Sequence, residues 1–126
     1  MEFPKDLKYT EDHEWAKLEE DGTITVGITN YAQVKLGDIV FLDIETEGDY
    51  VEQGEVFGSV EAVKTVSELF MPVSGTVLEV NATLEDSPEL VNTDPYEAGW
   101  LVKIKPSDPT HFEALLSSEA YEVIAV

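Results

Sequence analysis

Lys64 is the residue of this chain whose surroundings are best suited to chemistry on a side chain. It stands between two runs that are rich in valine and interspersed with Gly, Ser and Glu. A lysine amine is protonated at neutral pH, and it becomes a nucleophile that can form an amide once a proton is removed. An isolated lysine is usually just a solvated side chain. The structural elements around Lys64 therefore determine whether its amine is a site of covalent modification.

The length of the run around Lys64 predicts that it folds back on itself. A continuous strand over residues 55–71 would be ~55 Å long at ~3.3 Å per residue. A domain of this size has a radius of gyration near ~14 Å and a diameter of some ~35 Å. The run must therefore break, and its midpoint is Val63-Lys64-Thr65. We predict a hairpin within residues 54–75 that presents Lys64 at its tip.

The remaining reactive side chains favour no catalytic site. His13 and His111 lie far apart in the sequence, and the chain has no cysteine, so we interpret both as ordinary hydrogen-bonded histidines and expect no metal site. The 27 acidic residues occur at too many spacings for one acid/base pair to stand out. The sequence also lacks a glycine-rich phosphate loop, a nucleophile elbow and an HExxH motif. We expect a protein that is not an enzyme.

Size and charge narrow the class of protein further. The 126 residues predict one domain, residues 1–126, with a core of its own. A net charge of −20 disfavours nucleic acids and anionic lipids, and favours partners with basic surfaces and a monomeric state. The sequence shows neither a targeting signal nor a membrane-spanning run, so we expect a cytoplasmic protein without a membrane association, although a mature organellar protein that has lost its presequence would have the same features.

The chain in order predicts a mainly β fold. We expect strands over residues 9–19 and 23–28 joined at Asp21-Gly22, with Trp15, Leu18, Ile24, Val26 and Ile28 supplying core. A short helix should follow, capped by Asn30 and ended by Gly37. Further strands are expected at residues 39–44, 76–80 and 100–104, and residues 81–98 resemble a loop. Asp108-Pro109 and the stretch after Ser118 should each begin a C-terminal helix, with Phe112, Leu115 and Leu116 on the buried face of the first.

These elements predict an antiparallel β-sandwich or flattened barrel with short helices, two of them at the C-terminus. Several motifs, in order, then carry a resemblance to the H protein of the glycine cleavage system. The hairpin motif is Glu61-Ala62-Val63-Lys64-Thr65, followed by Pro72-Val73-Ser74-Gly75-Thr76-Val77. The others are residues 9–15 (YTEDHEW), 26–33 (VGITNYAQ), 36–41 (LGDIVF), 90–96 (LVNTDPY) and 99–104 (GWLVKI). The chain departs from the family pattern at Ala62, where Ser is more frequent, and in the apolar run Leu69-Phe70-Met71.

The resemblance implies a lipoyl-domain-like barrel-sandwich hybrid with lipoate attached to Lys64. It also implies that Asp12, Glu14 and Glu68 lie near a surface cleft that shelters the loaded arm. Carboxylates there would hold a cationic aminomethyl group, although solvated acids on an acidic surface would look the same in sequence. The attaching enzyme is expected to recognise the hairpin with its flanking Glu61 and Glu68.

By resemblance, the protein would carry the aminomethyl group of glycine from a pyridoxal-phosphate glycine decarboxylase to an aminomethyltransferase. Dihydrolipoamide dehydrogenase would reoxidise the arm, and a lipoate ligase or a lipoyl/octanoyl transferase would attach it. A biotin carboxyl carrier shares this hairpin, but its lysine is usually flanked by methionines, whereas Lys64 is flanked by Val63 and Thr65. A relay that donates lipoate to other enzymes and an unmodified interaction module of the same fold also stay open.

Overall fold

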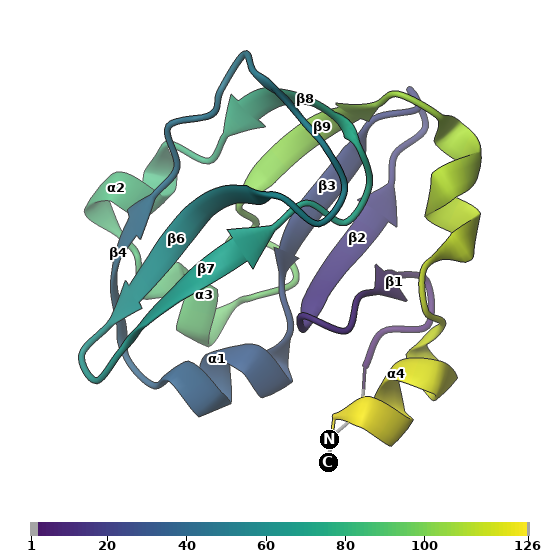
Figure 1. Ribbon diagram of the computed structural model, residues 1–126. Coiled ribbons are helices and arrows are strands. Elements are labelled where there is room, and N and C mark those ends of the chain that lie inside the picture. The colour runs from purple at the N-terminus through teal and green to yellow at the C-terminus, as the bar shows by residue number, and fades with distance from the viewer. Residues whose placement is uncertain (1–2, 126) are drawn as a thin grey trace.

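The computed structural model describes residues 3–125, whose strands form two antiparallel sheets with short helices around them (Figure 1). The larger sheet has the strand order β1-β2-β3-β9-β8-β5, and the smaller one has the order β4-β6-β7. The strands of the larger sheet are β1 (Lys8–Tyr9), β2 (Glu14–Leu18), β3 (Ile24–Ile28), β5 (Tyr50–Val51), β8 (Gly75–Val80) and β9 (Val102–Pro106). Those of the smaller sheet are β4 (Ile39–Asp43), β6 (Val56–Ala62) and β7 (Val66–Phe70).

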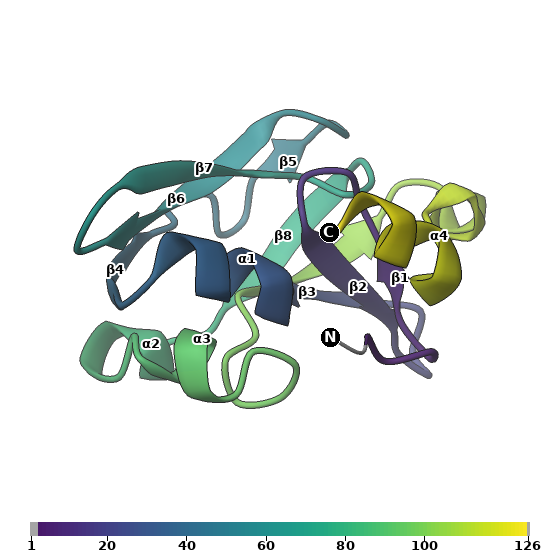
Figure 2. The ribbon, with the colours of Figure 1, turned by 90° about the horizontal axis from the view of Figure 1, so that it is seen from below.

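The helices are short and lie at the margins of the sheets. Figure 2 shows α1 (Asn30–Leu36) between β7 and α3 (Leu90–Thr93), and α4 (Ser118–Ile124) beside β1. The remaining two are α2 (Thr83–Asp86) and the 3₁₀ helix η1 (Pro109–Ala114). Among the described residues the sheets do not close into a barrel. The predicted class, a mainly β sandwich with short helices, is confirmed in this form.

The core lies between the two sheets and is built from the alternating inward side chains of their strands. Burying this apolar surface is the main favourable contribution to folding. A second cluster of aromatic side chains joins the N-terminal segment to α4, where the ring of Tyr9 stacks on that of Tyr121 with centroids 4.8 Å apart. Residues at the centre of the main core are Ile24, Val26, Val60, Leu69, Val77, Leu101 and Ile104.

The structure corrects several sequence-based boundaries near the site. The strand predicted over residues 9–19 is broken at residues 10–13, where the Thr10 hydroxyl accepts hydrogen bonds from the backbone N–H of Asp12 and of Glu14. Thr29, not Asn30, caps α1, because its hydroxyl accepts from the Ala32 N–H at 3.2 Å. Leu18 was predicted to be core but is exposed, since it stands at the end of β2.

The element boundaries predicted for the C-terminal half also differ from those of the structure. Residues 81–98 are not only loop, because they contain α2 and α3. The capping of η1 by Asp108 is confirmed, but the helix ends at Ala114, and Leu116 instead pairs with Tyr9 as an isolated β-bridge. The last helix begins at Ser118 itself, with Ser117 as its cap.

Candidate functional site

Lys64 lies exposed in the turn that joins β6 to β7, so the hairpin predicted from chain length is present (Figure 1). The Ala62 N–H donates to the Thr65 carbonyl at 2.7 Å, which closes the turn. The Val63 N–H donates to the Asp38 carbonyl at 2.9 Å, which ties the turn to the residue before β4. Within residues 3–125 no hydrogen bond or ion pair holds the Lys64 side chain. The amine is therefore displayed on a backbone that is fixed on both sides.

This hairpin is held rigid because β6 packs closely against the end of β4 and the residue that follows it. A Cβ at Gly58 would lie 2.8 Å from the Asp43 carbonyl oxygen and 2.7 Å from a side-chain carbon of Ile44. Glycine is thus required where β6 passes β4, since backbone atoms cannot move aside cheaply. The inward side chains Val60 and Leu69 are both buried in the core. This packing anchors the base of the arm that ends at Lys64.

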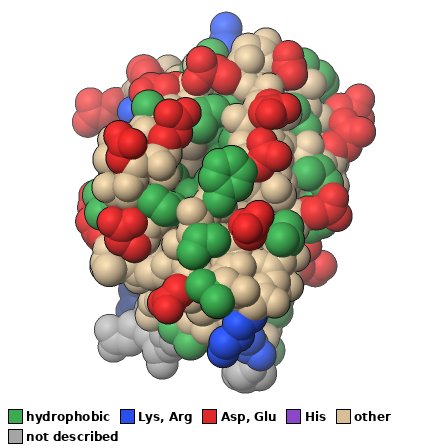
Figure 3. All heavy atoms as spheres, turned by 90° about the vertical axis from the view of Figure 1, so that its left-hand side faces the viewer, with side chains coloured by type: hydrophobic (Ala, Val, Ile, Leu, Met, Phe, Trp, Pro, Cys, Tyr) green, Lys and Arg blue, Asp and Glu red, His purple; other side chains and the backbone are tan. Residues whose placement is uncertain are grey.

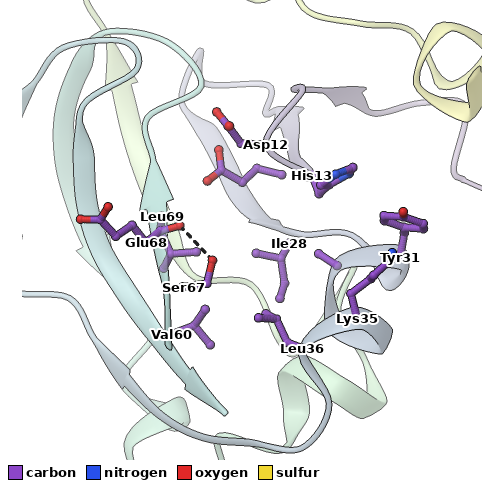
Figure 4. Close-up of a pocket in the computed structure, with 12 residues that line it drawn as sticks. Asp12, His13, Ile28, Tyr31, Lys35, Leu36, Val60, Ser67, Glu68 and Leu69 are labelled. Atoms are coloured by element: carbon purple, nitrogen blue, oxygen red, sulfur yellow. Dashed lines mark hydrogen bonds between the residues drawn. The ribbon is translucent and has the colours of Figure 1, made fainter. Parts of the chain in front are cut away.

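A cleft of about 260 Å³ opens between β7 and α1, on the inner side of the same hairpin (Figure 4). The α1 wall is formed by Tyr31, Ala32, Lys35 and Leu36, and the β7 wall by Ser67, Glu68 and Leu69. The other lining residues are Asp12, His13, Glu14, Ile28 and Val60. Lys64 is five residues from Leu69, which is at most about 17 Å at the usual rise per residue of a strand. A long acyl arm on Lys64 could fold back into this cleft.

Glu14 is the most unusual side chain of the cleft. It is 1% exposed, and its Oε2 accepts a hydrogen bond from the Phe70 N–H at 2.7 Å. Its Oε1 is buried and has no hydrogen-bond partner among the described residues. Burial raises the pKa of Glu14 to about 8, and the neighbouring Asp12 adds to the rise, while the Phe70 N–H opposes it. A buried carboxyl with one free oxygen can bind a cation that enters the cleft once the carboxyl has lost its proton, and the nearby positive charge itself favours that loss.

The other two acids predicted for the cleft differ from Glu14. Asp12 is exposed at the rim, beside Glu14. Glu68 borders the cleft, but Figure 4 shows its side chain directed to the far side of β7. The structure therefore brings Asp12, Glu14 and Glu68 to one place, with the three carboxylates in different environments. Their role in holding an arm stays a prediction.

Glu61, the residue predicted to guide the attaching enzyme, lies outside the cleft. It is exposed on the outer face of the smaller sheet, where it pairs with Phe41 of β4 and Val66 of β7. That position is next to the turn that carries Lys64. An enzyme acting on Lys64 could reach Glu61, which stays a prediction as well.

The two histidines lie in different environments, one at the surface and one in the cleft. His111 is at the surface, 3.5 Å from Asp108. His13 lines the cleft with a left-handed backbone (φ 66°), and its Nδ1 is 2.8 Å from the Tyr121 hydroxyl, which in turn is 2.7 Å from Thr29 Oγ1. Burial lowers the pKa of His13. In the sequence, His13 lies between Asp12 and Glu14, and this position was the only sign that it borders the same cleft.

The family model for the glycine cleavage H-protein matches residues 7–125. The chain belongs to the glycine cleavage H-protein family. It is 56% identical over 124 residues to the glycine cleavage system H protein of Bacteroides fragilis, which covers 98% of each chain. It is 59% identical over 122 residues to that of Pelodictyon phaeoclathratiforme, covering 96% of this chain and 95% of the relative. The crystal structure of the H protein from Mycobacterium marinum superposes with a TM-score of 0.87 at 41% identity, covering 96% of this chain and 97% of that one.

Membership of the glycine cleavage H-protein family makes this chain a carrier component of glycine cleavage. Family membership argues against the biotin carboxyl carrier, which the sequence analysis had left open, because the matches that extend over almost the full length of the chain are to H proteins. No helix within residues 3–125 is long and apolar enough to cross a bilayer. His13, Tyr31 and Lys35 were not predicted from the sequence to line the cleft of this family member.

Proposed function

We propose that this chain is a lipoyl carrier, with lipoate attached through an amide to Lys64, and that it shuttles the aminomethyl group of glycine between enzymes. The observation that carries this proposal is the placement of Lys64. The amine is exposed in a turn fixed by the Ala62–Thr65 and Val63–Asp38 hydrogen bonds, and the same hairpin forms one wall of a cleft. When bound, lipoate supplies a redox-active dithiolane at the end of a flexible arm.

The chain's own contribution is to tether and to shelter. A rigid tip with a flexible arm raises the local concentration of the carried group at each docked enzyme. Glu14 would hold the cationic aminomethyl group in the cleft through its free Oε1, and Asp12 at the rim would add to the attraction. The apolar side chains Ile28, Leu36 and Leu69 would limit the access of water. These residues bind and protect, and no catalytic step is assigned to them.

The proposed partners are enzymes that must bind and leave in turn. They are the pyridoxal-phosphate glycine decarboxylase, the aminomethyltransferase, dihydrolipoamide dehydrogenase, and a lipoate ligase or a lipoyl/octanoyl transferase. A net charge of −20 favours encounter with basic surfaces on these partners and makes association sensitive to salt. We further propose that residues 1–126 act as one domain, as a monomer, in the cytoplasm.

The proposal is tested by intact mass and peptide mapping of protein purified from its native host. We expect one lipoyl adduct located at Lys64, and no adduct on a Lys64→Arg variant that folds as the wild type does. A native protein without any adduct, or an adduct on another lysine, would contradict the proposal. Lipoylated protein that fails to support glycine decarboxylation with purified partners would point to the lipoyl relay instead.

The sheltering role has its own test. Glu14→Ala should speed the spontaneous loss of the aminomethyl group from the loaded carrier, and Glu20→Ala, an exposed acid outside the cleft, should not. An unchanged lifetime in Glu14→Ala would dispose of this role while leaving the attachment at Lys64 intact.

A further inference from the structure

The outer face of the β4-β6-β7 sheet, opposite the cleft, carries exposed apolar side chains next to the Lys64 turn. Phe41 is 54% exposed and Val66 is 61% exposed, and Val63 in the turn itself is 71% exposed. Side chains of this size and exposure seldom gather on a surface that only faces water. Figure 3 views the molecule from the side of β4 and shows apolar side chains near the centre, with acidic ones around them and basic ones toward the margins.

The strand register explains why these side chains form one patch. Glu61 of β6 pairs with Phe41 on one side and with Val66 on the other, so the three lie in a row across the sheet. Directly opposite side chains in such a ladder lie about 5 Å apart at Cβ. The row is two residues before Val63 on β6, and the Val63–Asp38 hydrogen bond fixes the turn beside the start of β4. The patch is therefore a rigid surface adjoining the amine.

The same face is acidic farther from the tip. The next row consists of Asp43, Ser59 and Glu68, again fixed by register. It borders a shallow hollow of about 330 Å³ to which Glu45 and Thr46 also contribute. Lys64 carries the only positive charge between Lys35 and Lys103 in the sequence, and among the described residues no ion pair neutralises Asp43 or Glu68. Acylation of Lys64 would remove that charge as well.

We propose that this outer face, from Phe41 and Val66 to Asp43 and Glu68, is the docking surface for the enzyme that acylates Lys64. This inference rests on the proposed acylation of Lys64. The occupant is a protein surface with an apolar projection that packs on Phe41 and Val66, and with arginine or lysine side chains that meet Asp43 and Glu68. Charge complementarity of this kind speeds association and fixes orientation.

Reach distinguishes the acylating enzyme from the other partners. The bare amine ends a side chain of four methylene groups, so an enzyme that forms the amide must come to the turn itself, and the sheet face that adjoins the turn then lies within reach of its surface. Enzymes that act on the far end of the finished arm can stand away from this face. A second copy of this chain would bring two strongly acidic surfaces together and is disfavoured by repulsion.

The test is the rate of lipoylation of the full-length unmodified protein by a purified lipoate ligase with lipoate and ATP, followed by intact mass. Phe41→Ser should lower kcat/KM for the protein substrate about tenfold, as is typical for loss of a central apolar contact, while full conversion is still reached. Leu18→Ser is the control, because Leu18 is also a large apolar side chain of similar exposure, 45%, on the other sheet. It should change the rate less than twofold.

Charge is tested separately with the pair Asp43→Asn and Glu68→Gln. The double variant should be lipoylated several-fold more slowly than the wild type at low ionic strength, and this ratio of rates should approach one as the salt concentration is raised. Glu20→Gln, an exposed acid on the β2–β3 turn, serves as the control. Equal rates for Phe41→Ser and Leu18→Ser, or self-association of the wild type that Phe41→Ser abolishes, would overturn the proposed occupant. Absence of any adduct on wild-type Lys64 would instead overturn the proposed function.

Discussion

Glu14→Gln should alter the pH dependence of stability by an amount that follows from the burial of this carboxyl. The side chain is 1% exposed, and burial raises its pKa from 4.5 to about 8. Between these values the folded chain retains a proton that the unfolded chain has released. The contribution of this group to the free energy of unfolding is therefore full at low pH and is lost as the pH rises toward 8.

The size of this loss can be worked out. Each pH unit well inside the window corresponds to about 1.4 kcal/mol, and less near pH 8, where Glu14 begins to ionise in the folded protein, so from pH 5.5 to pH 8 the loss is about 3 kcal/mol. Glutamine is neutral throughout this range, and its amide oxygen can still accept from the Phe70 N–H that now bonds Glu14 Oε2. The stability of Glu14→Gln relative to wild type should therefore rise by about 3 kcal/mol across the same range.

Urea unfolding at several pH values, from 5.5 to 8, measures this difference directly. Taking the difference between variant and wild type cancels the titration of the many surface acids, which are common to both. Glu20→Gln, at an exposed acid, should give a difference that does not vary with pH. If the Glu14→Gln difference changes by less than about 1 kcal/mol over the range, then Glu14 is ionised and hydrated in the folded protein, and the reasoning about its free Oε1 fails.

Three further predictions follow from contacts of the site. In the loaded carrier, the ratio of wild-type to Glu14→Gln aminomethyl lifetimes should grow from pH 6 to pH 8, because ionised Glu14 is the form that attracts a cation; a ratio that stays constant would contradict this. Thr29→Val should lower stability to urea by about 1–2 kcal/mol, because it removes the cap of α1 and one of the two partners of the Tyr121 hydroxyl, and an unchanged midpoint would argue against both bonds. Gly58→Ala should lower the melting temperature through a loss of about 1–3 kcal/mol, since its Cβ would meet the Asp43 carbonyl, and equal melting curves would show that β4 can move aside.

The hairpin and its lysine could be predicted from the sequence because chain length alone forbids a single strand there. The fold class followed from the same kind of evidence, many short strands separated by turn residues. The cap of α1 could not be assigned, because Thr29 and Asn30 are both good caps and the choice depends on Tyr121, far away in the chain. The two helices within residues 81–98 have four residues each, too short for a helical period to be recognised.

The cleft could be predicted only in part, and resemblance supplied that part. A glutamate at the start of a strand is normally solvated, and nothing local indicates that Glu14 is buried. Its burial arises from β7, whose Phe70 N–H reaches it across 56 residues of sequence. His13 lines the cleft at the end of the turn over residues 10–13, where its own backbone is left-handed (φ 66°), a conformation uncommon for residues other than glycine. Both are properties of the tertiary structure.

Alternation along β6 and β7 separates the two surfaces that a carrier of this kind needs. Val60 and Leu69 point inward and line the cleft. Glu61, the next residue after Val60 on β6, and Val66, three residues before Leu69 on β7, point outward to the proposed docking face. One stiff hairpin can thus offer its lysine to an enzyme on one side and draw the finished arm back on the other. Because Phe41 lines only the outer face and Glu14 only the cleft, substitutions at Phe41 should change attachment alone and those at Glu14 should change retention alone, whereas Glu68 borders both faces. A variant at either position that altered both rates together would show that the faces are coupled through the sheet.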